Sequence, residues 1–426
     1  MSFLTMMENI YSATDLSCLS NQHDKVLMSI FFKKIDMRKS LSAKKTLSLW
    51  QNHYLQNSMI KDVNIPNNDL KRLPPDTDLE TPEIFRACIK ANKALAELKG
   101  CCLRLPNPEL LLNTVILQES KSSSEIENIV TTQDDLYRAT LDDVGKITNP
   151  AAKEVILYRE AVYKGVELFK NQGIVTINTL IKIMQTLRGS QEGIRKVCGV
   201  KIANPSTKTV IYTPPETEVI VREKLSDLEK FINDDNTQLD SLVKMALIHY
   251  QFEAIHPFTD GNGRTGRILN IIYLIKEGLL DMPVLYLSHY IIANKSLYYK
   301  LLNTVTLHDS WAEWVIYMVN AVEETAKYTL KQIEEILKLK NETELRVKDV
   351  LQNNIYKELT DLLFAHPYIK IKVLENKGIA KRQTVSIYLK KLSAAGILNP
   401  VKLWKETYYV NTALFDLLSK GIELKN

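Results

Sequence analysis

Apolar residues recur at helical spacing through most of this chain, and that periodicity constrains the fold more than any other feature of the sequence. Ile84, Cys88, Ala91 and Leu95 are one example, because positions three and four apart share one face of a helix. Helices with the same pattern are predicted at 107–132, 151–169, 177–186, 218–233, 241–254, 264–277, 294–307 and 311–339. The sequence therefore predicts a mainly α-helical protein.

One stretch interrupts the helical pattern. Several glycines between 189 and 199 break it. The stretch VCGVKI then leads on to Thr209–Thr213, in which residue types alternate, and Pro214 and Pro215 follow. Alternation flanked by glycine and proline is typical of strands joined by a turn. We therefore expect a β-hairpin, within about 201–213, inserted between helices.

The composition fits a multidomain protein of a reducing compartment. At 426 residues and 48.8 kDa, the chain is too long for one ordinary hydrophobic core. Its five cysteines show no CxxC spacing, so neither a disulfide framework nor a structural zinc site is indicated. The early apolar run Val26–Phe32 is far too short to span a bilayer and lacks a small-residue cleavage site. We expect a cytoplasmic protein without a membrane partner.

The carboxy-terminal part has a pattern and a charge of its own. After the long helix, three helical segments end at Leu392, and an alternating stretch, Leu403–Val410, follows. This order predicts a winged helix-turn-helix. Residues 366–426 hold 11 Lys and Arg against 4 acidic residues. Such a surplus suggests contact with a polyanion, although solvated surface lysines explain it equally well.

The segment His256–Arg267, HPFTDGNGRTGR, contains the parts of an anion-binding catalytic site. Glycines at the start of a helix leave backbone N–H groups free for an anion, which the helix dipole also favours. Arg264 and Arg267 are three apart, so both guanidinium groups can reach the oxygens of a polyphosphate. Asp260 is suited to hold Mg²⁺, and His256 is suited to accept a proton near pH 7. Together these residues predict phosphoryl or nucleotidyl transfer.

Each part of this segment also has a simpler explanation. A glycine run is often only a turn, a lone histidine is often a core residue, and paired arginines often only solvate a surface. GNGRTG satisfies GxGxxG but follows a helical stretch rather than a strand, which argues against a dinucleotide-binding βαβ unit. No GxxxxGK[ST] pattern occurs, which argues against a P-loop ATPase.

HPFTDGNGRTGR is similar to the Fic family signature HPFx[D/E]GNGRxxR at every constrained position. LPPDTDLET and KANKALAELKG resemble the module that precedes this domain in many bacterial members, and LYLSHYIIANKSLYYKLL resembles the segment after it. The resemblance extends from about Leu73 to Asn320. It implies a Fic-type helical core whose β-hairpin is a flap that docks the target protein by adding a strand.

The resemblance implies a protein adenylyltransferase that moves AMP from ATP to a Ser, Thr or Tyr hydroxyl, with Mg²⁺ as cofactor. His256 would deprotonate that hydroxyl, and Asp260 would bind Mg²⁺. The implied nucleotide-binding residues are Gly261, Asn262, Gly263, Arg264, Thr265, Gly266, Arg267 and, at an adenine-contacting position, Tyr299. Self-modification and a homodimer are also expected from this resemblance.

A second motif predicts self-inhibition. Ser123, Glu127 and Asn128 fit the family's inhibitory pattern, [S/T]xxxE followed by Gly or Asn, within a helix expected at about 119–133. A carboxylate that pairs with Arg267 removes the partner of the γ-phosphate, so ATP binds only in a poor geometry. The alternative is a solvated, Ser-rich helix. In some members the same glutamate is implied to position a water that removes AMP, and this alternative stays open.

We predict five parts in the chain. They are an N-terminal extension (1–58), a Fic N-terminal module with the inhibitory helix (59–145), a Fic catalytic core (146–320), a connecting helix (321–345) and a winged-helix domain (346–426). Lys381, Arg382 and Gln383 would begin the recognition helix, which binds either DNA or another protein. Two rival functions remain: transfer or removal of another nucleotide group, and a DNA-binding regulator whose Fic core senses a nucleotide.

Overall fold

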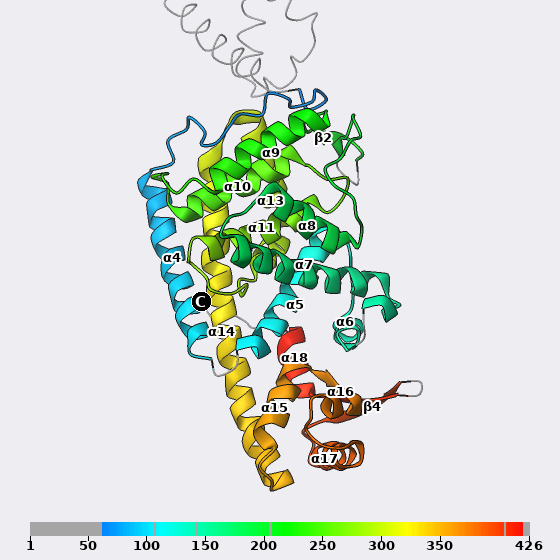
Figure 1. Ribbon diagram of the computed structural model, residues 1–426. Coiled ribbons are helices and arrows are strands. Elements are labelled where there is room, and N and C mark those ends of the chain that lie inside the picture. Colours follow the sequence, from blue (N-terminus) through cyan, green and yellow to red (C-terminus); the bar gives the residue numbers. More distant parts are fainter. Residues whose placement is uncertain (1–61, 106–107, 142–143, 204–206, 404–405, 421–426) are drawn as a thin grey trace, which may run out of the picture. The chain divides into compact units, whose positions relative to one another are not determined.

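The chain is mainly helical, as the periodicity predicts. A computed structural model describes residues 62–105, 108–141, 144–203, 207–403 and 406–420 (Figure 1). Its α-helices are α4 (Pro82–Leu103), α5 (Pro108–Ile126), α6 (Gln133–Ala139), α7 (Pro150–Gln172), α8 (Ile177–Arg188), α9 (Glu218–Ile232), α10 (Ser241–Ile255), α11 (Asn262–Lys276), α12 (Leu287–Ala293), α13 (Lys295–His308), α14 (Trp311–Leu351), α15 (Tyr356–Ala365), α16 (Ile371–Asn376), α17 (Arg382–Ala394) and α18 (Thr412–Lys420). A short 3-10 helix, η2 (Val144–Lys146), precedes α7. The predicted extension at 1–58 lies outside the described residues. Over the described part of the chain, no helix is both long and apolar enough to cross a membrane.

The helix limits differ from the predicted ones in several places. The sequence pattern misses α6, α12 and α18, because seven to nine residues offer few turns in which periodicity can be seen. Helix α14 continues well past Leu339, because its charged second half still buries Val347 and Leu351. The predicted connecting region, 321–345, is therefore the middle of one unbroken helix. The limits of the five predicted parts stay predictions.

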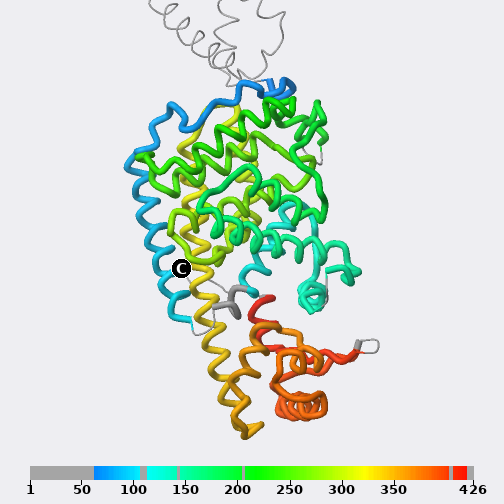
Figure 2. Tube along the Cα trace, viewed as in Figure 1, coloured from blue at the N-terminus to red at the C-terminus, as the bar shows by residue number. Residues whose placement is uncertain are grey.

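Helices α10 and α11 form the centre of the core. Helix α10 buries thirteen of its fifteen residues, so protein surrounds it on every face. Helix α11 packs beside α10 and buries the mostly apolar run Ile268–Ile275. The long α14 lies along α4 and also packs against α10 (Figure 2). The loop that joins α10 to α11 is therefore held at both ends by buried helices.

The predicted hairpin is present but short. Strand β1 (Ile202–Ala203) pairs antiparallel with β2 (Val210–Tyr212). Tyr212 is buried, and its hydroxyl donates to the carbonyl of Ala254 at 2.8 Å. Since Ala254 stands near the end of α10, this hydrogen bond fastens the hairpin two residues before His256.

The carboxy-terminal segment has the order of elements predicted for a winged helix-turn-helix. Helices α15, α16 and α17 are followed by β4 (Asn399–Leu403) and β5 (Glu406–Val410). Strand β5 lies between β4 and β3 (Tyr368–Ile369), and both pairs are antiparallel. Helix α15 packs against α5, so this segment contacts the helix that contains the predicted inhibitory motif.

Candidate functional site

A tight loop joins α10 to α11 and contains the motif. His256 ends α10 with a φ of 49°, and Gly261 precedes α11 with a φ of 84°. The left-handed region is unusual for a residue other than glycine, and the surroundings must offset its cost. Asn262 contributes here, because its Oδ1 accepts from the N–H of Phe258 at 2.9 Å and its Nδ2 donates to the Phe258 carbonyl at 2.8 Å. These contacts hold the loop, and with it the backbone of His256.

The first turn of α11 is an open anion site. No side chain caps this helix, so the N–H groups of Asn262, Gly263 and Arg264 have no partner within it. Because Gly263 has no side chain, a group can approach these N–H groups closely. A Cβ at this position would collide with Glu127 Oε1, which lies there in this structure. Backbone donors and the helix dipole favour a negative group at this place. In this structure the Glu127 carboxylate stands beside it.

Arg264 is held inside the core. Its side chain is 1% exposed, and Nη1 donates to Glu154 Oε2 of α7 at 2.7 Å. Arg188, the last residue of α8, lies 3.7 Å from the same oxygen. The Nε of Arg264 is buried and has no hydrogen-bond partner among the described residues. A carboxylate of α7 therefore fixes this arginine and leaves its Nε as an unused donor.

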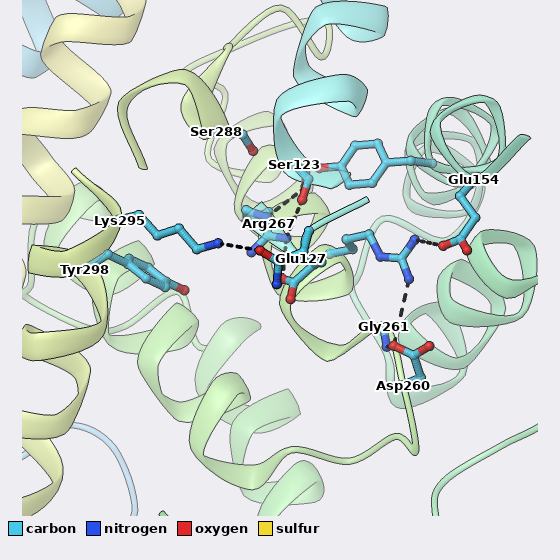
Figure 3. Close-up of polar contacts among 12 residues, drawn as sticks. Ser123, Glu127, Glu154, Asp260, Gly261, Arg267, Ser288, Lys295 and Tyr298 are labelled. Atoms are coloured by element: carbon cyan, nitrogen blue, oxygen red, sulfur yellow. Dashed lines mark hydrogen bonds and ion pairs between the residues drawn. The ribbon is translucent and has the colours of Figure 1, made fainter. Parts of the chain in front are cut away.

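Arg267 is equally buried, but its partners come from helix α5 and the turn directly after it. Its Nε donates to Ser123 Oγ at 2.8 Å, and its Nη2 donates to the Ser123 carbonyl at 2.9 Å and to Glu127 Oε1 at 2.7 Å (Figure 3). Burial is the largest single effect and disfavours the charged guanidinium, but the charge and hydrogen bond of Glu127, together with Tyr298 and Tyr158, outweigh it and hold the pKa of Arg267 above its ordinary value. The predicted inhibitory helix, about 119–133, ends at Ile126, and the structure brings Ser123 within it and Glu127 directly after it onto the arginine that ends the catalytic segment.

Two further contacts fix α5 beside the site. Glu119 is 2% exposed, and its carboxylate accepts from the N–H of Ser288 at 2.8 Å, from the Ser288 hydroxyl at 2.5 Å and from Tyr158 at 3.0 Å. Burial raises the pKa of Glu119, although these hydrogen bonds act in the opposite direction. Ser122 Oγ lies 2.6 Å from the hydroxyl of Tyr286. The polar residues that weaken α5 by helix propensity are therefore the residues that bind it to the core.

Asn128 turns the chain directly after Glu127. Its φ is 63°, and its Oδ1 accepts from Lys295 Nζ at 3.4 Å. Asparagine and glycine adopt this left-handed conformation more readily than other residues do. This conformation gives a physical reason for glycine or asparagine at the last position of the inhibitory motif.

His256 is suited to accept a proton. Burial, followed by the charge of nearby Arg195, lowers the pKa of His256 to about 4, so its imidazole is neutral at pH 7. Its Nδ1 is buried and has no hydrogen-bond partner in the described part of the chain. A neutral imidazole with a free ring nitrogen can act as a general base.

Arg195 ties the catalytic loop to the flap. It is 2% exposed, and its Nε donates to the His256 carbonyl at 2.8 Å, while its backbone N–H donates to the Pro257 carbonyl at 2.9 Å. Its other guanidinium nitrogens donate to the carbonyls of Pro215 and Glu216, which follow the hairpin. One buried arginine therefore links the flap to the backbone of the proposed base.

Asp260 is the candidate ligand for Mg²⁺. Its side chain is 56% exposed, Oδ2 lies 2.8 Å from Arg188 Nη1, and Oδ1 accepts the N–H of Gly261 at 2.5 Å. Among the described residues, no three His, Cys, Asp or Glu side chains converge as a metal cage. Mg²⁺ is commonly held by one or two carboxylates together with substrate phosphates. A single carboxylate beside an anion site fits that pattern.

A pocket of about 200 Å³ opens beside the loop. His256, Gly263, Arg267 and Glu127 line one part of it, and the rest is mainly aromatic and aliphatic, including Tyr250, Tyr298 and Tyr299. Tyr299 is 43% exposed, whereas Tyr298 is buried and its hydroxyl lies 2.8 Å from His249 Nε2. An apolar pocket with a few convergent polar groups is the usual form of a small-molecule site. Its anion site and flat side chains suit a nucleotide.

The structure does not bring every predicted site residue to this pocket. Thr265 is fully buried, and Gly266 packs so closely against Glu253 of α10 that a Cβ would collide with the carboxylate. Neither residue lines the pocket, and the predicted residues Asp260, Gly261, Asn262 and Arg264 do not line it either. The run Lys381–Gln383 is exposed at the start of α17 and belongs to a separate surface.

Sequence reasoning missed several contributors to the site. Glu119 and Glu253 stand within the stretches ILQES and FEAIH, where a charge beside apolar residues is unusual and could have marked them. Glu253 Oε1 is buried without a partner among the described residues, and burial raises its pKa to about 8. Arg195 and Glu154 gave no such signal, because their partners come from distant parts of the chain.

Three family models match this chain. The Fic/DOC family N-terminal model matches residues 85–167, and the Fic/DOC family model matches residues 173–274. A model described as the C-terminal domain of SoFic-like protein adenylyltransferases matches residues 339–414. The first match contains the motif at 123–128, and the second contains His256–Arg267.

Curated relatives share part of the chain. Protein adenylyltransferase fic-1 of Caenorhabditis briggsae is 29% identical over 112 residues, which are 26% of this chain and 21% of that protein. A probable protein adenylyltransferase of Aquifex aeolicus is 27% identical over 181 residues, which are 41% of this chain and 52% of that protein. The chain thus spans about a fifth to a half of the length of these relatives.

Two solved structures resemble this one at low identity. A Fic family protein from Desulfovibrio desulfuricans has a TM-score of 0.49 and 21% identity, covering 79% of this chain and 98% of that one. A fragment of Fic-1 from Caenorhabditis elegans has a TM-score of 0.46 and 20% identity, covering 61% of this chain and 75% of that one.

Proposed function

The chain belongs to the Fic/DOC family, and we propose that it is a protein adenylyltransferase, which moves AMP from ATP to a hydroxyl side chain of a target protein. One observation carries the proposal: a single pocket joins a neutral histidine, the uncapped start of a helix and a buried arginine. These parts supply a base, donors for the charge on phosphate, and a grip on the outer phosphates.

His256 is the general base in this proposal. Its Nδ1 takes the proton of the target hydroxyl while that oxygen bonds to the α-phosphorus of ATP. The bond between the α-phosphorus and the bridging oxygen to the β-phosphorus breaks, and pyrophosphate leaves with the electron pair. The N–H groups of Asn262, Gly263 and Arg264 stabilise the charge on the α-phosphate, and Arg264 with Arg267 holds the outer phosphates.

Asp260 would hold Mg²⁺, and the ion would neutralise charge on the phosphates when bound. Arg188 occupies this carboxylate in the structure, at 2.8 Å. We expect Arg188 to leave Asp260 when a nucleotide and Mg²⁺ enter together, since Glu154, 3.7 Å away, offers it a second partner.

Glu127 is the inhibitory group in this proposal. Its Oε1 bonds Arg267 at 2.7 Å and lies so close over Gly263 that a Cβ at that position would collide with it. The carboxylate therefore uses a donor that the outer phosphates of ATP need. A nucleotide that enters beside Glu127 loses this partner and is held in a poor geometry for transfer.

The test is transfer of label from ATP labelled at the α-phosphate. Wild type, Glu127→Gly, His256→Ala and the double variant are incubated with Mg²⁺, with and without cell lysate. We expect strong labelling of protein by Glu127→Gly, weak labelling by wild type, and none by either variant that lacks His256. Label on the chain itself without lysate would demonstrate self-modification.

The same assay decides between the rival transfers. Labelled UTP, GTP and CTP run in parallel identify the transferred nucleotide, and pre-labelled protein incubated without ATP tests for removal of AMP. If none of the four proteins transfers any nucleotide, the transferase proposal is wrong.

DNA binding by the C-terminal segment is a second candidate function. Lys381–Gln383 are exposed at the start of α17, the second helix of the helix-turn-helix, and residues 366–426 hold 11 basic against 4 acidic residues. Exposed cations at this position suit contact with a phosphate backbone. Fluorescence anisotropy with duplex DNA should show binding that weakens with salt and in the double variant Lys381→Glu/Arg382→Glu. Absence of binding at low salt would favour a protein partner instead.

A further inference from the structure

A second cavity, of about 350 Å³, lies between helix α5 and the winged-helix segment. Asn113, Thr114 and Leu117 of α5 form one wall, and helices α6 and α7, residues 365–367 and Lys377 form the others. None of these residues lines the pocket that contains His256. The proposed transferase reaction therefore leaves this cavity without a role.

Basic side chains outnumber acidic ones in the cavity wall. Arg159, His366 and Lys377 line it, and Glu160 is the one carboxylate among the described lining residues. Glu160 pairs with Arg159 at 2.9 Å, but its side chain is 43% exposed, against 18% for Arg159. Burial lowers the pKa of His366, and the charges of Arg159 and Lys377 lower it further. An anion in the cavity would meet two permanent positive charges.

The wall also offers polar groups. Thr114 is 3% exposed and lines the cavity. Asn113 accepts from the Tyr163 hydroxyl through Oδ1 at 2.8 Å, which leaves the amide nitrogen as a further donor. Both side chains carry groups that can hydrogen-bond a ligand in the cavity.

Tyr137 connects the cavity wall to the inhibitory helix. It is 1% exposed, and its hydroxyl accepts from Gln118 of α5 at 2.7 Å. Its ring stacks on Tyr368 with centroids 6.3 Å apart and meets the edge of Phe415 at 6.0 Å. Gln118 lies about one helical turn before Ser123, which bonds Arg267. A ligand that displaces Tyr137 would therefore act on α5, the helix whose Ser123 bonds Arg267.

We propose that this cavity is an effector site for a small anion, whose phosphate or carboxylate group is held by Arg159 and Lys377, and that its occupancy changes the hold of α5 on Arg267. The regulatory part rests on the proposed transferase function, whereas the binding part does not. Ligand pockets generally measure about 300–1,000 Å³, so a cavity of this size fits a compact molecule rather than a polymer.

Binding is tested by titration calorimetry of the full chain with inorganic phosphate and with citrate, which separate the two anion chemistries. We expect saturable heat from at least one of them, with affinity at least tenfold weaker in Arg159→Met and in Lys377→Glu. Lys372→Glu is the matched control, because Lys372 is an exposed lysine of α16 that does not line the cavity, and it should bind as wild type does. Arg267→Ala should also retain binding, which excludes the α11 site as the source of the heat.

Absence of saturable heat with both anions overturns the site, and so does loss of binding in Arg267→Ala with retention in Lys377→Glu. The coupling is read independently of activity by amide hydrogen exchange of residues 113–126. We expect the saturating anion to change exchange there at least threefold in wild type and not in Lys377→Glu. Unchanged exchange overturns the effector role even where the anion binds. A chain that transfers no AMP but passes both tests refutes the transferase proposal alone.

Discussion

Arg264 and Arg267 stand three residues apart in α11 and are equally buried. The carboxylate that binds Arg264 lies within a helix of the core, whereas the one that binds Arg267 lies in a turn. Each side chain is 1% exposed, and each donates to a glutamate at 2.7 Å. Glu154, the partner of Arg264, lies in α7, which packs directly on α11. Glu127, the partner of Arg267, follows the end of α5, a helix held at this site largely through serines and Glu119.

Two arginines that are equally buried thus have partners of different origin, and the proposed function gives the two pairs different roles. Arg264 has an unpartnered Nε, and we expect it to keep Glu154 when a nucleotide enters. Arg267 would exchange a carboxylate for a phosphate, because Glu127 stands over Gly263 at the start of α11. A buried cation needs a negative partner, and under this proposal two negative groups compete for Arg267.

Removing Arg267 should have the largest effect on AMP transfer, and it tests the role proposed for this arginine in holding phosphate. Arg267→Ala in a Glu127→Gly chain should lower AMP transfer by about 10²–10³-fold, because it deletes a donor to the developing phosphate charge. Initial rates with ATP labelled at the α-phosphate measure this loss. Arg267→Lys is the conservative control and should restore only part of the rate, because lysine cannot bind a phosphate in two places. A rate unchanged by Arg267→Ala would contradict the assigned role.

Removing Glu127 should have the next largest effect, in the opposite direction. Glu127→Gly frees a charge-assisted hydrogen bond of about 1.5–3 kcal/mol, so transfer should rise by about 10–100-fold. Glu127→Gln keeps the shape but loses the charge, and its rate should fall between those of wild type and the glycine variant. Equal rates in all three proteins would show that the contact with Arg267 does not limit transfer.

Removing Glu154 should affect stability more than activation. Glu154→Gln leaves buried Arg264 without its carboxylate and should lower the free energy of unfolding by about 1–3 kcal/mol. Glu127→Gln should cost less, because Arg267 keeps both bonds to Ser123. Urea unfolding followed by circular dichroism compares the two. Glu160→Gln, which changes a half-exposed pair, is a control expected within about 0.5 kcal/mol of wild type.

The sequence predicted the parts of the fold that depend on local patterns. Helical spacing predicted most helices, and the glycine-rich run after His256 predicted an open start of α11, because backbone donors at a helix start need no distant partner. The sequence did not predict Arg195, whose contact with His256 spans 61 residues, or the pairing of Arg264 with Glu154 across 110 residues. It also placed Thr265 and Gly266 at the nucleotide, although helix geometry turns both into the core.

The smallest expected effect is a shift in pH dependence that leaves both arginines unchanged. Guanidinium groups keep their charge at accessible pH, so His256 is the basic residue of the motif whose charge responds to acid. Its lowered pKa of about 4 keeps the imidazole neutral and able to accept a proton well below pH 6.5. In Glu127→Gly, the rate should therefore stay level from about pH 8 to about pH 5.5 and fall as pH drops towards 4. A midpoint near 6.5 would show an imidazole with an ordinary environment.

Helix α14 runs for 41 residues without a break, from the core that surrounds α10 to the start of the winged-helix segment. Each residue of an α-helix turns the chain by about 100° and advances it by 1.5 Å. One inserted residue would therefore swing everything after it by about 100° and take Tyr368 away from Tyr137. Seven inserted residues would nearly restore the direction but shift the segment by about 10 Å. Surface loops tolerate insertions, whereas the number of residues in α14 fixes the orientation of the C-terminal segment relative to the helices around α10.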